Sequence, residues 1–62
     1  MNAVLVDVIS QPGSTAGEIT ARVGASFADV CDALAALMRV GLVRIGELRG
    51  SRATWWWVDP DG

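Results

Sequence analysis

Cysteine and histidine, on which many small catalytic and metal sites depend, are scarce in this chain of 62 residues. The sequence has one cysteine, Cys31, and no histidine. This excludes an internal disulfide, a zinc site of Cys and His ligands and a nucleophile activated by histidine. We therefore expect no enzymatic activity. We expect Cys31 to be a small buried apolar residue, and the alternative is a redox switch.

Two acidic residues one helical turn apart, Asp29 and Asp32, have the spacing of a minimal metal site. Two carboxylates without further ligands hold a cation poorly, whereas helix capping and contact with solvent explain both residues. We expect neither a metal nor any other cofactor.

Arginine supplies all the positive charge, and its distribution along the sequence is uneven. Residues 1–38 carry four acidic residues and one arginine, whereas residues 39–53 carry four arginines and one glutamate. A surface that attracts anions is therefore expected in residues 39–53. Arg49 and Arg52 are candidates for contacts with phosphate, and the alternative is a hairpin tip whose charges only interact with solvent.

Three consecutive tryptophans are the least ordinary feature of the sequence. In a strand, alternation predicts that Trp56 faces the helices, together with Thr54 and Val58. It leaves Trp55 and Trp57 on the other side. Neighbouring exposed tryptophans are typical of protein interfaces, so this pair predicts self-association or the docking of a partner. Ordinary packing and base stacking are the alternatives.

Composition indicates one folded domain, residues 1–62, in which residues 59–62 form a flexible tail. Hydrophobic residues make up 52% and charged residues 19% of the chain, which is too apolar for disorder. So short a chain buries little surface, which favours a dimer or a bound partner. The longest aliphatic run, Ala33–Met38, has six residues and is too short to span a membrane. We expect a cytoplasmic protein without a membrane partner.

Three short helices are expected in residues 1–41. The first covers Ala3–Ser10, where helical spacing would bury Leu5, Val8 and Ile9. The β-branched residues in the same segment make a strand the competing interpretation.

Capping signals define the two helices that follow. Thr15 and Glu18 have the spacing of a capping box, in which two side chains satisfy free backbone N–H groups at a helix start. Gly24 suits the left-handed end of that helix, and Ser26 can cap the next one after a short turn. Gly41 ends the third helix, whose predicted buried face consists of Val30, Leu34 and Leu37.

After the third helix the pattern of the sequence changes from helical to alternating. Leu42–Ile45 and Ala53–Val58 are rich in β-branched and aromatic residues, and they flank Gly46–Arg52. This arrangement predicts a β-hairpin with a basic tip.

The order of these elements resembles the winged helix-turn-helix domains of MarR and ArsR-like regulators from bacteria and phages. Leu34–Val43 is similar to the family's L-x-x-L-x-x-x-G-L-V, at the junction of the third helix and the wing. Gly50–Val58 resembles the return strand of the wing, G-x-R-x-x-x-aromatic-x-aliphatic. The resemblance implies an α+β fold of three helices followed by a two-stranded β-hairpin wing.

The resemblance also implies a transcriptional regulator that binds double-stranded DNA, as a dimer. In the family the third helix enters the major groove while the wing reaches the backbone or the minor groove. The corresponding positions in this chain are Ser26, Phe27, Ala28, Asp29, Asp32, Ala36, Arg49, Ser51 and Arg52. The outer face of the third helix holds Asp and Ala, where DNA readers more often present basic or amide side chains. The alternative is therefore a winged-helix module that docks on another protein and does not bind DNA.

Overall fold

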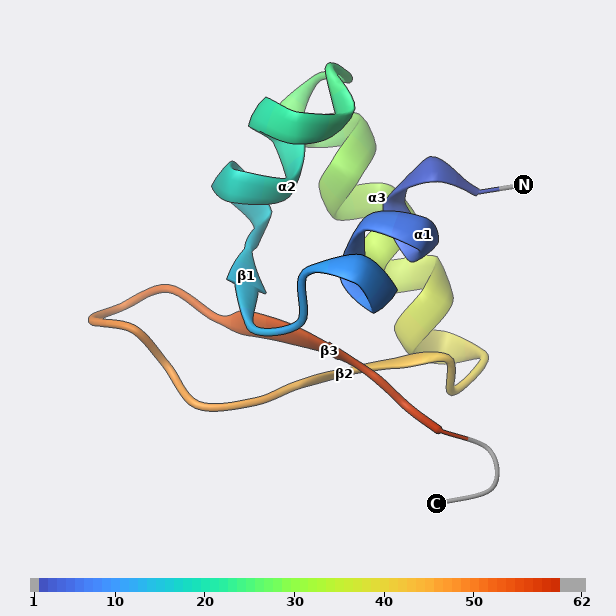
Figure 1. The fold of residues 1–62 in the computed structure, drawn as a ribbon, viewed down its shortest axis with the longest axis vertical. Coiled ribbons are helices and arrows are strands. Elements are labelled where there is room, and N and C mark those ends of the chain that lie inside the picture. The colour runs from blue at the N-terminus through green and yellow to red at the C-terminus, as the bar shows by residue number, and fades with distance from the viewer. Residues whose placement is uncertain (1, 60–62) are drawn as a thin grey trace.

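The computed structural model describes residues 2–59 and has three helices and a small antiparallel sheet (Figure 1). The elements follow one another as α1 (Ala3–Ser10), β1 (Ser14–Thr15), α2 (Ala16–Val23), α3 (Phe27–Arg39), β2 (Val43–Ile45) and β3 (Thr54–Trp57). The predicted order of three helices and a hairpin is confirmed, and the first segment is a helix rather than a strand. No helix within residues 2–59 is long and apolar enough to cross a membrane.

The sheet contains a strand, β1, that the sequence pattern does not reveal. Strand β3 lies in the centre and pairs antiparallel with β1 on one side and β2 on the other. Two residues are too few for an alternating pattern, and β1 forms because its backbone meets the free edge of β3, with Thr15 opposite Thr54. The strand ties the connection between α1 and α2 to the hairpin.

Each helix begins at a side chain that accepts backbone hydrogen bonds. The predicted capping box is present: the Thr15 N–H donates to Glu18 Oε1 at 2.9 Å and the Glu18 N–H donates to Thr15 Oγ1 at 3.3 Å. Ser26 caps α3 as predicted, and Gly24 ends α2 with φ at 80°. The cap of α1 is Asn2, whose side chain accepts from the N–H groups of residues 4 and 5.

The core lies between the three helices and the sheet. Its fully or almost fully buried apolar residues are Val4, Val8, Ile19, Val30, Leu34, Leu37 and Val43. The predicted buried face of α3 is confirmed. The predicted face of α1 is partly wrong, because Ile9 is 47% exposed and Val4 takes its place one turn before Val8. Cys31 is half-buried rather than fully buried.

The predicted orientation of the tryptophans is wrong. Trp57 lies opposite the buried Val43, and Trp56 lies opposite the exposed Arg44. Because directly opposed residues share a face of the sheet, Trp57 and Trp55 point toward the helices, where both pack against the core, and Trp56 points away. The prediction placed Thr54 on the helical face together with Trp56. Thr54 is instead covered on the outer face, where its hydroxyl donates to the Glu47 carbonyl and accepts from Trp56 Nε1.

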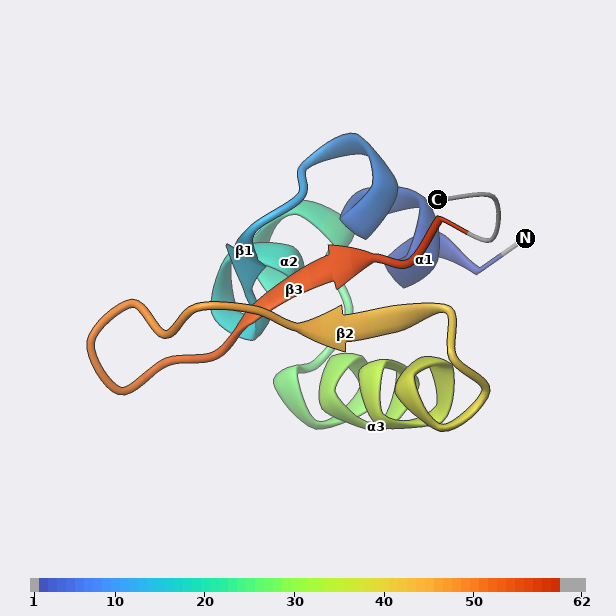
Figure 2. The ribbon, with the colours of Figure 1, turned by 90° about the horizontal axis from the view of Figure 1, so that it is seen from below.

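Among residues 2–59, no helix covers the outer face of the sheet (Figure 2). The ring of Trp56 lies there against Gly13 and Gly46, and a Cβ at Gly46 would overlap Nε1 of the indole. The guanidinium carbon of Arg44 lies 5.6 Å from the ring centroid, within the range of a cation–π contact. Two residues without side chains thus allow this tryptophan to lie close to the backbone.

The burial of α3 predicts a large difference between two of its apolar positions. Leu34→Ala removes a fully buried side chain and should lower the free energy of unfolding by about 2–5 kcal/mol, much of the stability of a domain this small. Met38→Ala is the matched control, because Met38 is 43% exposed. Urea unfolding followed by circular dichroism measures both. Equal losses in the two variants would contradict the assignment of this face to the core.

Candidate nucleic-acid interface

The six positions of α3 and its cap that were predicted to contact DNA are all exposed: Ser26, Phe27, Ala28, Asp29, Asp32 and Ala36. Phe27, the first residue of α3, has 58% of its surface exposed although it is a large apolar side chain. The face therefore offers an aromatic ring, small side chains and two carboxylates. No basic group lies among these six residues.

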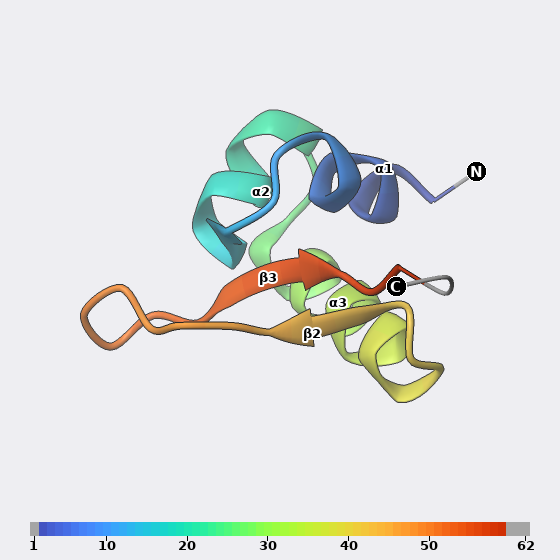
Figure 3. The same cartoon turned by 60° about the horizontal axis from the view of Figure 1, so that its bottom comes forward.

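The positive charge lies on the segment between β2 and β3, Gly46–Ala53, which we call the wing. It extends beyond the helices (Figure 3). Its tip is closed by two backbone hydrogen bonds, from the Arg49 N–H to the Arg52 carbonyl at 2.9 Å and from the Arg52 N–H to the Arg49 carbonyl at 3.2 Å. Gly50 supplies the left-handed residue of this turn, with φ at 65°. Arg49, Ser51 and Arg52 are exposed, as their predicted roles require.

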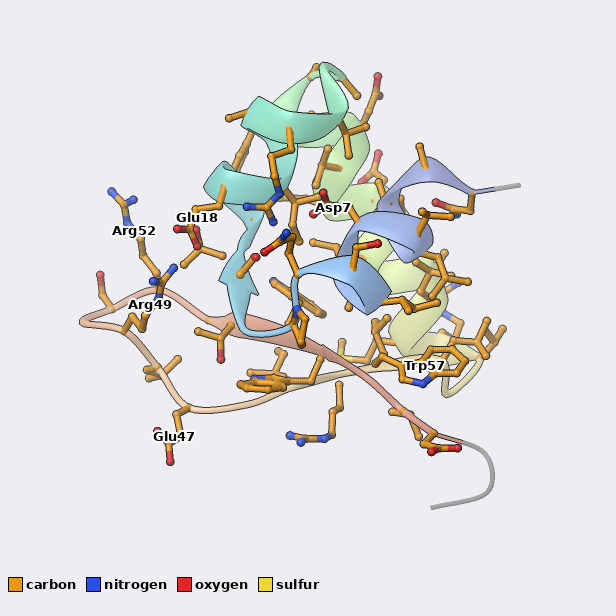
Figure 4. All side chains as sticks on the ribbon, viewed as in Figure 1. Asp7, Glu18, Glu47, Arg49, Arg52 and Trp57 are labelled. Carbon is orange, nitrogen blue, oxygen red and sulfur yellow. The ribbon has the colours of Figure 1, made fainter. Side chains whose placement is uncertain are left out.

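Both tip arginines project on the side of the wing that faces α2, whereas Glu47 projects to the other side (Figure 4). Antiparallel pairing explains the shared direction, because Arg49 and Arg52 form a bridge and therefore lie directly opposite each other. The hairpin geometry thus presents two cations on one face.

Arg49 forms an ion pair that sequence reasoning did not find. Its Nη2 donates to Glu18 Oε1, the atom that also accepts from the Thr15 N–H in the capping box. The Thr15 hydrogen bond lowers the pKa of Glu18, partial desolvation opposes this, and the nearby Arg49 charge lowers the pKa further. No local signal in the sequence links two residues 31 positions apart.

A groove connects the start of α3 to the base of the wing. It encloses about 420 Å³ and is lined by Thr15, Ala16, Gly17, Phe27, Arg52, Ala53 and Trp55. The structure therefore brings Phe27 and Arg52, two of the predicted site residues, to one surface feature. Asp32 and Ala36 lie farther along α3 and do not line it.

A second ion pair connects α2 to α1. The Arg22 guanidinium donates to both carboxylate oxygens of Asp7, at 2.9 and 2.8 Å, and to the Ser14 hydroxyl at 2.6 Å. The hydrogen bonds to Asp7 raise the pKa of Arg22 above its ordinary value. This contact joins α1, α2 and β1, so the one arginine of residues 1–38 has a structural role.

Among solved structures, the chain is similar to the PcaV transcriptional regulator from Streptomyces coelicolor, determined in complex with its natural ligand. The TM-score is 0.85 at 24% sequence identity, and the match covers 95% of this chain. It covers 43% of the PcaV chain, so this chain spans less than half of that protein. The likeness confirms the predicted winged-helix fold. No protein-family model and no curated protein matches the sequence.

The lowered pKa of Glu18 predicts an acid-dependent difference between the wild type and Glu18→Gln. A carboxylate whose pKa is depressed in the folded state stabilises the fold above its unfolded pKa, about 4.5. That contribution is lost as the pH falls through the lower folded value. Urea unfolding at a series of pH values should show that the free energy of unfolding of the wild type exceeds that of Glu18→Gln by a constant amount near neutrality. This difference should become smaller below pH 4.5. A gap that stays constant throughout the series would contradict a role for the charge of Glu18.

Proposed function

We propose that this chain is a DNA-binding transcriptional regulator of the winged-helix type and not an enzyme. The observation that carries the proposal is the exposed pair Arg49 and Arg52, which project together from the wing beside the groove that Phe27 also lines. Arg52 and Phe27, the first residue of α3, line the same groove. Such a surface can contact a ligand that offers both phosphates and base edges, as DNA does. Such a regulator would act in the cytoplasm of a bacterium or in a phage-infected cell.

In this proposal the two parts of the interface contribute differently. The start of α3 lies in the major groove, and the wing contacts the backbone or the minor groove. Asp29 and Asp32 can accept hydrogen bonds from cytosine, but carboxylates near phosphates repel them. The wing therefore supplies most of the attraction, and binding should depend strongly on salt and weakly on sequence.

Docking on another protein, without DNA binding, is the second candidate function. The observation that favours it is the outer face of α3, where exposed Ala and Asp residues replace the basic side chains of a typical DNA reader. Such a face could pack against a partner with a complementary basic surface. The wing arginines would then be charges exposed to solvent.

The wing assignment predicts a change in the salt dependence of binding. Arg49→Gln with Arg52→Gln should weaken binding to a long duplex of mixed sequence. The slope of log K against log salt should flatten by about 0.9 for each phosphate that the variant no longer neutralises. The matched control is Arg39→Gln with Arg44→Gln, which removes equal charge away from the wing. Fluorescence anisotropy across a salt series measures both variants.

Two outcomes decide between the candidate functions. Equal slopes in the two double variants would contradict the wing as the DNA-contacting element. No binding by the wild type even at low salt would favour the protein-docking function. Asp32→Ala provides a further test of α3: it should tighten DNA binding if this face approaches phosphates, and leave it unchanged if the face contacts a protein.

Dimer formation is part of the proposal, because two arginine contacts per chain give weak affinity and two linked wings on one duplex give much more. Trp55 and Trp57, the predicted interface, are half-buried and pack against the core of their own chain, and a dimer through their exposed parts stays a prediction. We expect a species near twice 6.5 kDa by sedimentation at micromolar concentration. A mass of 6.5 kDa at every concentration would contradict the dimer.

A further inference from the structure

The ion pair between Glu18 and Arg49 joins the wing to the helix-turn-helix unit. Glu18 lies in the first turn of α2, and Arg49 lies at the tip of the wing (Figure 4). One carboxylate oxygen, Oε1, accepts from the backbone of Thr15 and from the guanidinium of Arg49. The capping box therefore holds the carboxylate in place, and the carboxylate in turn holds the wing arginine.

The wing tip has little else to position it. The last backbone hydrogen bond at its base runs from the Gly46 N–H to the Thr54 carbonyl, and the tip is closed only on itself through Arg49 and Arg52. The residues between these two closures, 47–48 on one side and 53 on the other, are unpaired in the ladder. Nearer the base, the Thr54 hydroxyl donates to the Glu47 carbonyl. A side-chain contact to α2 can therefore help to select the position of the tip beyond Glu47.

The ion pair occupies a group that the proposed function needs. Arg49 carries one of the two positive charges of the tip, and Glu18 neutralises it in the protein without DNA. The two side chains remain 55% and 45% exposed, so water and salt screen the pair and its strength is small. A phosphate can replace the carboxylate as a partner of Arg49 at low cost, whereas a buried pair would resist that exchange.

We propose that Glu18 is a positioning residue that holds the wing in a DNA-free position through Arg49, and that a DNA phosphate takes its place when the wing engages the duplex. The phosphate part of this inference rests on the proposed function. The wing-holding part does not, since it concerns the free protein.

The variant Glu18→Gln tests the wing-holding part without DNA. Glutamine also serves in a capping box, so it retains the acceptor for the Thr15 N–H while it removes the charge that attracts Arg49. We expect faster backbone motion of residues 48–52, measured as lower NMR order parameters, with α2 unchanged. Glu47→Gln is the matched control, because it removes the same charge from the wing on the side away from Glu18. Equal wing motion in Glu18→Gln and the wild type would overturn the proposal.

A duplex titration tests the phosphate part. Glu18→Gln should bind a long mixed-sequence duplex more tightly than Glu47→Gln does, by up to about five-fold, the range expected for release of a surface ion pair. In an Arg49→Gln background the two glutamate variants should bind alike, because no arginine is left to release. Equal affinities of the two single variants, or an advantage of Glu18→Gln that persists without Arg49, would overturn the exchange.

The outcomes separate this inference from the proposed function. If the wild type binds no duplex, the proposed function fails and the exchange with phosphate fails with it, while the NMR result still decides whether Glu18 holds the wing. If the wild type binds DNA and the glutamate variants do not differ, only the exchange fails.

Discussion

Thr15 is the residue on which the arrangement of the rest depends. It is a strand residue, paired with Thr54 of β3, and it is the N-cap of α2. It is buried, with a relative exposure of 5%. Because one residue belongs to both the sheet and the helix, the start of α2 must lie against the centre of the sheet. The capping partner Glu18 is thereby placed within reach of the wing.

The separation of charge follows from the same geometry. The helical part of the chain presents carboxylates on α3, and the cations project from a hairpin that extends past the helices. The carboxylates of α3 would repel a polyanion if this helix were the main point of contact. Under the proposed function, the attraction to DNA comes from the wing, which meets only the start of α3, at Phe27.

The tryptophan strand shows how packing uses both faces of a thin sheet. Trp55 and Trp57 extend the core, and Trp56 covers an outer face that no helix protects. Glycines on both sides of the ring leave space for it, and Arg44 lies over it. The strand can hold three tryptophans in a row because they pack on different faces of the sheet. Trp55 and Trp57 pack against the core, and Trp56 lies flat against Gly13 and Gly46 on the outer face.

The sequence by itself determined the local structure: the capping box, the left-handed Gly24, the buried face of α3 and the basic hairpin. The first three depend on neighbours within about four positions, and the hairpin on two β-rich runs joined by one short segment, so spacing and residue type are sufficient. The tertiary structure alone decided the strand β1, the direction of the tryptophans and the pairing of Glu18 with Arg49. Each of these depends on which distant segment covers a given face or edge. Thr54 illustrates the reason: alternation shows that it shares a face with Trp56, but that this face is covered by the Glu47 segment and not by the helices was decided only in the folded chain.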